Sequence, residues 1–184
     1  MAPVLSEPAI RISPPGSRGV RIPSQGPVPL LFNVGGMVLI WMYRRLGGLW
    51  SRPGFRMVLL TTRGARTGRT RTVPLGGFSD GKDAWLVVGS LAGAARHPAW
   101  LFNMAKHPEA VWLEVGRERF KVRAETLEGS DRADAFARIA TIAPPYAAYQ
   151  TKTDREIPLV RLTQEDGREH GTGRLEGDRR GDSS

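Results

Sequence analysis

The chain has 184 residues, enough for one domain with a substantial core, and its formal net charge is +9. It contains no cysteine, which excludes disulfides, thiol nucleophiles and thiolate metal sites. The three histidines follow no metal-ligand spacing, so we expect no metal site; they are His97, His107 and His170.

The positive charge is concentrated in the body of the chain. Between Arg44 and Arg71 there are eight arginines and no aspartate or glutamate. Such a local excess indicates an anionic partner. A phosphorylated cofactor, nucleic acid and an anionic membrane surface are the three candidates.

The first part of the chain is expected to be an arm followed by a helix. Residues 1–28 contain six prolines and no hydrophobic periodicity, which predicts a disordered or loosely draped arm without a signal peptide. The apolar run at 30–43 predicts a helix, assigned to residues 29–46, that is shorter than the ~20 apolar residues needed to span a bilayer. Trp41 and Tyr43 lead into Arg44 and Arg45, an aromatic and basic border typical of membrane interfaces. The helix is therefore expected either to pack on the core or to act as an interfacial helix or lid.

Six strands and three short helices are predicted between residues 55 and 162. The strands are expected at residues 55–62, 70–78, 84–88, 110–115, 119–125 and 157–162, and the helices at 99–105, 131–142 and 146–152. Pro74 implies an edge or a bulge in the second strand, and Asp80-Gly81 implies a turn. Ser130 is the expected N-cap of the second helix. The inner face of that helix is expected to be Ala133, Phe136, Ala137 and Ala140.

Short strands with few helices, in a mostly antiparallel order, predict a small barrel of the α+β class rather than βαβ units. This domain is expected to span residues 29–163. A disordered polar tail is expected at residues 164–184, and the cytoplasm is the expected location.

The stretch between the first two strands, residues 63–71, is called the arginine turn here. Gly64 and Gly68 flank Arg66 and permit close approach of a ligand to the backbone. Amides and guanidinium groups with no nearby carboxylate favour a phosphate over a merely solvated hairpin. The turn is not a P-loop, because the Gly-Lys-Ser/Thr ending is absent. Nucleic acid is disfavoured because no aromatic residues are interleaved with the arginines.

Two further stretches could contribute to a site. The small residues after Gly89 would let a flat ring approach the backbone, with Ser90 as a hydrogen-bond partner, although an ordinary connecting loop would look similar. His97 is expected to cap or pack rather than to act as a base. Tyr146 and Tyr149 lie on one helical face, either as proton donors or as half-buried packing residues. No nucleophile constellation is visible, so a bound cofactor is expected to supply any chemistry.

These residues resemble a known family. The run from Leu59 to Leu75 (LLTTRGARTGRTRTVPL) resembles the opening signature of the deazaflavin-dependent nitroreductase family of actinobacteria. Further similar segments are Trp41–Arg45, Gly89-Ser90 with Gly93-Ala94, His97–Asn103, Pro108, Tyr146–Gln150 and Thr153–Pro158. The resemblance covers residues 38–162, in order and at matching spacing.

The resemblance implies a split β-barrel of the flavin-reductase type. It also implies coenzyme F420, a deazaflavin with a phosphate and an oligoglutamate tail. The implied activity is hydride transfer from reduced F420 to a quinone or nitroaromatic acceptor. An FMN-dependent oxidoreductase on the same barrel and a non-catalytic deazaflavin-binding protein are the alternatives. The expected partners are the small-molecule acceptor, a second copy in a homodimer and, through the N-terminal segment, the inner face of the cell membrane, but no nucleic acid.

Carried over by position, the resemblance assigns two sets of site residues. Cofactor binding falls to Arg63, Arg66, Thr67, Gly68, Arg71, Val73, Pro74, Ser90, Leu91, Ala92, Gly93 and Arg96. Catalytic roles fall to Tyr146, Tyr149 and Ser90. The chain departs from the family at Leu91, where a lysine is common, and at Ala143, where a third tyrosine is common. An anion contact is therefore expected to pass to Arg96 or Arg63, and the acceptor pocket is expected to be larger or less polar.

Overall fold

The computed structural model describes residues 9–21, 27–46 and 51–165, and for residues 27–35 it describes the backbone only. The expected tail therefore lies outside the described residues from position 166 onward. Among the described residues, no helix is long and apolar enough to cross a membrane.

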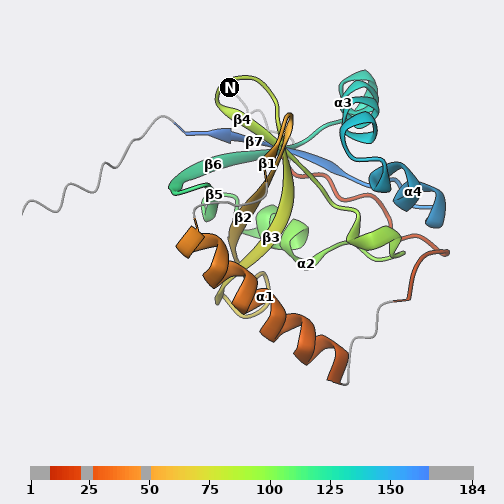
Figure 1. Cartoon of the computed structure of the whole chain (residues 1–184). Coiled ribbons are helices and arrows are strands. Elements are labelled where there is room, and N and C mark those ends of the chain that lie inside the picture. Colours follow the sequence, from red (N-terminus) through yellow and green to blue (C-terminus); the bar gives the residue numbers. More distant parts are fainter. Residues whose placement is uncertain (1–8, 22–26, 47–50, 166–184) are drawn as a thin grey trace, which may run out of the picture.

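The centre of the molecule is an antiparallel barrel of six strands (Figure 1). The strands are β2 (Phe55–Arg63), β3 (Thr70–Ser79), β4 (Ala84–Val88), β5 (Val111–Val115), β6 (Glu118–Thr126) and β7 (Leu159–Gln164). They follow the order β2-β3-β4-β7-β6-β5, and β5 pairs again with β2 to close the barrel. A two-residue strand, β1 (Ser51–Arg52), extends the sheet beside β2. The expected α+β barrel of mostly antiparallel strands is confirmed.

The helices lie outside the barrel. They are α1 (Pro27–Leu46), α2 (Ala99–Lys106), α3 (Gly129–Ile142) and α4 (Pro145–Lys152), with a short 3-10 turn, η1 (Leu91–Gly93), before α2. Figure 1 shows α3 and α4 together on one side of the barrel and α1 on another. This arrangement leaves β3 between the two groups of helices.

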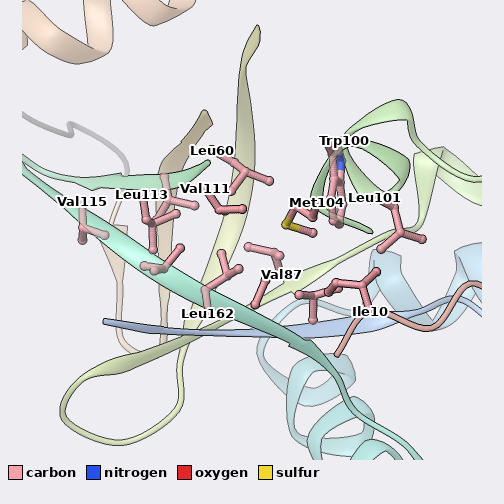
Figure 2. Packing of buried hydrophobic residues seen from close by; sticks show 14 residues of the cluster. Ile10, Leu60, Val87, Trp100, Leu101, Met104, Val111, Leu113, Val115 and Leu162 are labelled. Carbon is pink, nitrogen blue, oxygen red and sulfur yellow. The ribbon is translucent and has the colours of Figure 1, made fainter. Parts of the chain in front are cut away.

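Alternation along the strands fills the barrel with side chains. The interior cluster includes Val58 and Leu60 from β2, Leu113 from β5 and Val122 from β6, all fully buried. Figure 2 shows Trp100, Leu101 and Met104 of α2 completing this cluster. A second cluster, built around Phe78, Leu86, Ile139 and Leu159, packs α3 and α4 against the outer face of the sheet. Phe120, Val122 and Ala124 alternate along β6 and all face the interior cluster.

Strand β3 has an unpaired edge that matters for the site. β3 pairs with β2 along its whole length but with β4 only through residues 77–79. Residues 70–76 therefore have no strand partner on their second side among the described residues. Pro74 lies in this part, where its missing N–H costs no ladder hydrogen bond. The edge position predicted from Pro74 is confirmed.

Two expectations about the elements are corrected. The arm predicted over 1–28 is not disordered at residues 9–21, which lie against the barrel, and the Ile10 side chain is buried in the interior cluster (Figure 2). The residues of the arm before 9 and at 22–26 lie outside the described part. The last strand begins at Leu159 and includes Gln164, two residues later than predicted.

Helix α3 also differs from its prediction. It begins at Gly129, after Glu128, and no side chain caps it, so Ser130 is not the N-cap. Its buried residues are Ala135 and Ile139, whereas Ala133 and Ala137 are exposed. The helix is rotated because burying the large Ile139 side chain removes more apolar area from water than burying further alanines does.

Candidate functional site

The arginine turn joins β2 to β3 and is held in a fixed shape. The Gly64 amide donates to the Arg69 carbonyl at 2.9 Å, and the Gly68 amide donates to the Gly64 carbonyl at 2.8 Å. Gly68 has a φ of +66°, which favours glycine. Asn103 of α2 braces the turn from below, because its side-chain oxygen accepts from the Ala65 amide at 2.8 Å.

Asn103 is a site-shaping residue that sequence reasoning did not single out. It is buried, and its side-chain nitrogen donates to the Thr62 hydroxyl at 3.0 Å, so the amide group spans the end of β2 and the turn. The only sequence signal was its place in the His97–Asn103 segment of the family resemblance. Its role depends on α2 packing beneath the turn, which is a tertiary contact.

The guanidinium groups of the turn point outward without neutralising partners. Arg63, Arg66, Arg69 and Arg71 are all exposed. Within the described part of the chain, none of the four forms an ion pair with a carboxylate. The turn is therefore a concentrated patch of uncompensated positive charge, suited to a polyanionic ligand.

The loop after β4 has an unusual backbone. Leu91 and Ala92 both have positive φ, at 43° and 55°, and Gly93 follows at 82°. Ser90 is buried, and its carbonyl accepts from the Gly93 amide at 2.9 Å. A Cβ at Gly93 would lie 2.9 Å from the Tyr149 carbonyl oxygen, so this loop is in direct contact with α4.

Two tyrosines of α4 lie between this loop and the free edge of β3. The rings of Tyr146 and Tyr149 meet edge to face, with centroids 5.8 Å apart, and Tyr146 meets Phe78 in the same way at 5.5 Å. A Cβ at Gly76 would lie 2.7 Å from the Tyr146 hydroxyl oxygen, so β3 admits the phenol only because it has glycine there. Burial raises the pKa of Tyr146, and the neighbouring Tyr149 adds to the rise. The phenol therefore stays protonated and able to donate.

The predicted site residues thus lie along one path. The arginine turn continues into the free edge of β3, which leads through Gly76 to Tyr146, then to Tyr149 and on to Gly93 and Ser90. Pro74 lies on this edge, whereas the Val73 side chain packs against the barrel interior and Arg96 is exposed at the far end of the loop. Within the described residues, no hydrogen bond or ion pair joins the turn directly to the loop.

Arg155 forms no ion pair with the neighbouring Asp154 within the described residues. Arg155 is only 3% exposed and lies beneath the loop, where it donates to the carbonyls of Gly89, Ser90 and Ala94. Asp154 points the other way and accepts hydrogen bonds from residues 17 and 18. Burial of an arginine in a polar segment leaves no periodic signal, so the sequence could not reveal it.

Helix α1 is fixed to the barrel at its C-terminal end. The buried Tyr43 hydroxyl donates to the Met57 carbonyl at 3.0 Å and accepts from the Gly116 amide at 2.7 Å. Arg44 forms a two-point ion pair with Glu114, at 2.8 and 2.6 Å. The helix is therefore attached through polar contacts.

The outer face of the same helix is apolar and basic. Met37 is 70% exposed, Trp41 is 60% exposed, and Val38 and Leu46 are also exposed. The Arg45 guanidinium lies over the Trp41 ring, 5.6 Å from its centroid. A shallow open hollow on this face is lined by Met37, Ile40, Trp41, Arg44 and Arg45. An exposed surface of this composition is typical of a binding or membrane-facing site.

Comparison with known proteins agrees with this geometry. Residues 38–164 match the family model described as F420H(2)-dependent quinone reductase. An F420H(2)-dependent quinone reductase of Mycobacterium tuberculosis (strain H37Rv) is 39% identical over 112 residues, which are 58% of this chain and 72% of that protein.

Two solved structures are also similar. A structure titled as an F420-H2 dependent reductase (FDR-A) aligns with a TM-score of 0.52 and 37% identity, over 58% of this chain and 92% of that one. A structure titled as a domain-swapped dimer aligns with a TM-score of 0.55 and 32% identity, over 74% of this chain and 99% of that one. The comparisons support F420 as the cofactor and do not support FMN. The chain belongs to the family of F420H(2)-dependent quinone reductases and is an oxidoreductase that depends on F420.

Proposed function

We propose that this chain passes a hydride from reduced F420 to a lipophilic quinone, with the cofactor lying along the free edge of β3. The observation that carries the proposal is the arginine turn, whose four guanidinium groups have no acidic partner among the described residues. F420 carries a phosphate and several carboxylates, so its charge complements this patch. The free edge of β3 leads from the patch to the two tyrosines.

The backbone of the turn supports phosphate binding at one place. The amides of Ala65, Gly68 and Arg69 are already engaged within the turn or with Asn103. The amides of Arg66 and Thr67 have no acceptor among the described residues and remain to bind a phosphate oxygen. We assign the phosphate to these two amides together with the side chains of Arg66 and Arg71. Gly68 contributes the shape of the turn rather than a donor.

The ring of the cofactor fits against the loop at 90–94. Bound F420 in its reduced form supplies the hydride. Small side chains at Ala92 and Gly93 allow a flat ring to approach the backbone, and Ser90 offers a hydroxyl. Leu91 stands where the family often has a lysine, so Arg96 or Arg63 supplies the remaining positive charge.

The tyrosines would complete the reaction at the acceptor. A quinone that accepts a hydride becomes an oxyanion, which needs a hydrogen bond and then a proton. The Tyr146 phenol can donate the hydrogen bond, because burial raises its pKa and keeps it protonated. When it passes its proton to the oxyanion, water reprotonates the phenolate. Ala143 packs partly buried in the same cluster as Tyr146 and Tyr149, so it leaves more apolar room for a quinone than a third tyrosine would.

Binding and acceptor assays test this proposal. Purified protein should bind F420 in preference to FMN, and it should accelerate the oxidation of reduced F420 by menadione. A nitroaromatic compound, compared under the same conditions, should be reduced more slowly. Binding of F420 without acceleration by any acceptor would instead indicate a non-catalytic deazaflavin-binding protein.

The exposed face of α1 supports peripheral attachment to a membrane. Its apolar residues provide area to bury at the headgroup boundary, and Arg45, which lies over the Trp41 ring, provides attraction to anionic lipids. Such attachment, at the inner face of the cell membrane in the cytoplasm, would place the protein beside a lipid-soluble quinone. Cosedimentation with anionic vesicles should exceed that with zwitterionic vesicles and should fall in Trp41→Ser. Equal sedimentation of the wild type and the variant would contradict this part of the proposal.

A homodimer is the proposed assembly. The support is a solved structure at 32% identity that is described as a domain-swapped dimer. Analytical ultracentrifugation of the full chain should give about twice the monomer mass of 20.2 kDa. A monomer at all accessible concentrations would contradict it.

A further inference from the structure

The loop between β4 and α2 holds a conformation that side chains disfavour. Leu91 and Ala92 adopt consecutive positive φ angles of 43° and 55°. Non-glycine residues remain in such a conformation only where the surrounding structure imposes it. The contacts that impose it come from two directions, below and outside the loop.

From below, the loop is held by Arg155. Its Nε donates to the Ala94 carbonyl at 2.8 Å, and its Nη2 donates to the carbonyls of Gly89 and Ser90 at 2.9 and 3.0 Å. Arg155 is 3% exposed and forms no ion pair with a carboxylate of the described chain. The planar guanidinium group thus joins both ends of the loop, which the single ammonium group of a lysine could not do in the same geometry.

From outside, the loop is held by residues 9–21, called the N-terminal strap here. The Gly16 amide donates to the Ala95 carbonyl and the Val20 amide donates to the Gly93 carbonyl, both at 2.9 Å. Val20 forms a parallel bridge with Ala94. A Cβ at Gly19 would overlap the backbone nitrogen of Ala95, so the strap lies this close only because residue 19 is glycine.

His97 connects the strap to Arg155. The His97 Nε2 lies 2.8 Å from the Ser13 carbonyl oxygen, so this nitrogen carries the hydrogen. The Nδ1 is then free to accept from Arg155 Nη1, at 3.3 Å. Asp154, the neighbour of Arg155, accepts from the amides of Ser17 and Arg18 at 3.1 and 3.0 Å. The strap, the loop and the Thr153–Arg155 segment therefore form one hydrogen-bonded unit.

We infer that the N-terminal strap and Arg155 are positioning elements of the F420 site: they hold the loop at 90–94 in the shape that receives the deazaflavin ring, without touching the ring. The inference rests on the proposed function, which assigns that loop to the ring. The strap lies outside residues 38–164, the part of the chain that matches the family model. A loop preorganised in this way binds its ligand without a further ordering cost.

The test uses the full chain with Gly19→Ala, which forces the strap away from Ala95. Its matched control is Gly36→Ala, the same chemical change at a helix position where the added Cβ would meet no described atom outside its own helix backbone within 4 Å. Hydrogen exchange at the Val20 and Gly93 amides measures release of the strap and loop, and equilibrium titration measures the Kd for F420. Gly19→Ala should exchange faster at both amides and bind F420 about tenfold more weakly or worse. Its kcat at saturating F420 should stay within about twofold, and Gly36→Ala should match the wild type in all three measurements.

A second variant keeps the test independent of the strap. Arg155→Lys retains the charge but loses the planar guanidinium group that reaches several carbonyls at once. It should also weaken F420 binding, while the thermal unfolding transition stays cooperative. Faster exchange in Gly19→Ala with an unchanged Kd would overturn the inference, as would exchange equal to that of the wild type. If the wild-type protein itself does not bind F420, the proposed function fails instead, and the two failures are distinguishable.

Discussion

Replacing Tyr146 by phenylalanine removes a single oxygen atom, and this loss should lower kcat while leaving the stability of the fold nearly unchanged. The Tyr146 hydroxyl makes no hydrogen bond to any described residue, so its removal breaks no structural interaction. Removing a half-buried hydroxyl that has no partner should change the free energy of unfolding by less than about 1 kcal/mol. If the phenol donates to the reduced quinone, its loss removes one transition-state donor, a cost of about 2.7–4 kcal/mol or 10²–10³ in kcat. The Kd for F420 should not change.

The matched control is Tyr43→Phe, because its phenol has the opposite surroundings. The Tyr43 hydroxyl bonds to Met57 and Gly116, so its removal should lower the free energy of unfolding by about 1–3 kcal/mol. Turnover with a water-soluble quinone should stay near the wild-type value. Urea unfolding and steady-state kinetics on both variants give the comparison. A Tyr146→Phe enzyme with undiminished kcat would refute the assignment of the proton donor.

Three further predictions follow from the site. Arg66→Ala should weaken F420 binding by about 1.5–3 kcal/mol, or 10- to 150-fold. The control is Arg119→Ala, which removes an arginine stacked on a tryptophan of β5 and should not weaken binding. Equal losses in the two variants would mean that F420 is held by nonspecific charge attraction. Gly76→Ala should displace the Tyr146 phenol, since the new Cβ would lie 2.7 Å from its oxygen, and should lower kcat while sparing the Kd for F420. Turnover equal to that of the wild type would place the phenol outside the reaction.

The third prediction concerns the pH dependence of the free energy of unfolding, which His97 should influence. Burial lowers its pKa below the ordinary 6.5, and the Arg155 charge adds to this, so the folded protein holds a neutral imidazole. Below about pH 6.5 the unfolded chain binds a proton that the folded chain does not, so stability should fall as pH drops from 6.5 to the folded pKa, by up to about 1.4 kcal/mol per unit. Urea unfolding across this range should show a shallower slope for His97→Gln. An unchanged slope would contradict the neutral assignment.

The barrel could be predicted because local patterns determine its strands. The alternation at Phe120, Val122 and Ala124 reports one buried face, and the turn at Asp80-Gly81 and the edge at Pro74 follow from backbone chemistry. Helix α3 shows the limit of such patterns. Its alanines could face either way, and the position of Ile139 against the sheet decided the rotation.

The contacts that hold the site in shape could not be predicted, because they join segments that are distant in the sequence. The N-terminal strap is proline-rich and lacks periodicity, yet its backbone bonds to residues 93–95 order it. Arg155 looks like any solvated arginine in the sequence, and only the fold places three carbonyl groups around its guanidinium. The arginine turn was visible because its charge is uncompensated within the sequence itself.

The central claim is that the protein binds reduced F420 and delivers its hydride to a quinone. Rapid mixing of the protein–reduced F420 complex with menadione measures this step directly, as the rate at which the cofactor is reoxidised. The rate should saturate with menadione and should exceed the protein-free rate at every concentration. Reoxidation no faster than in the absence of protein, or no binding of F420 at micromolar concentrations, would contradict it.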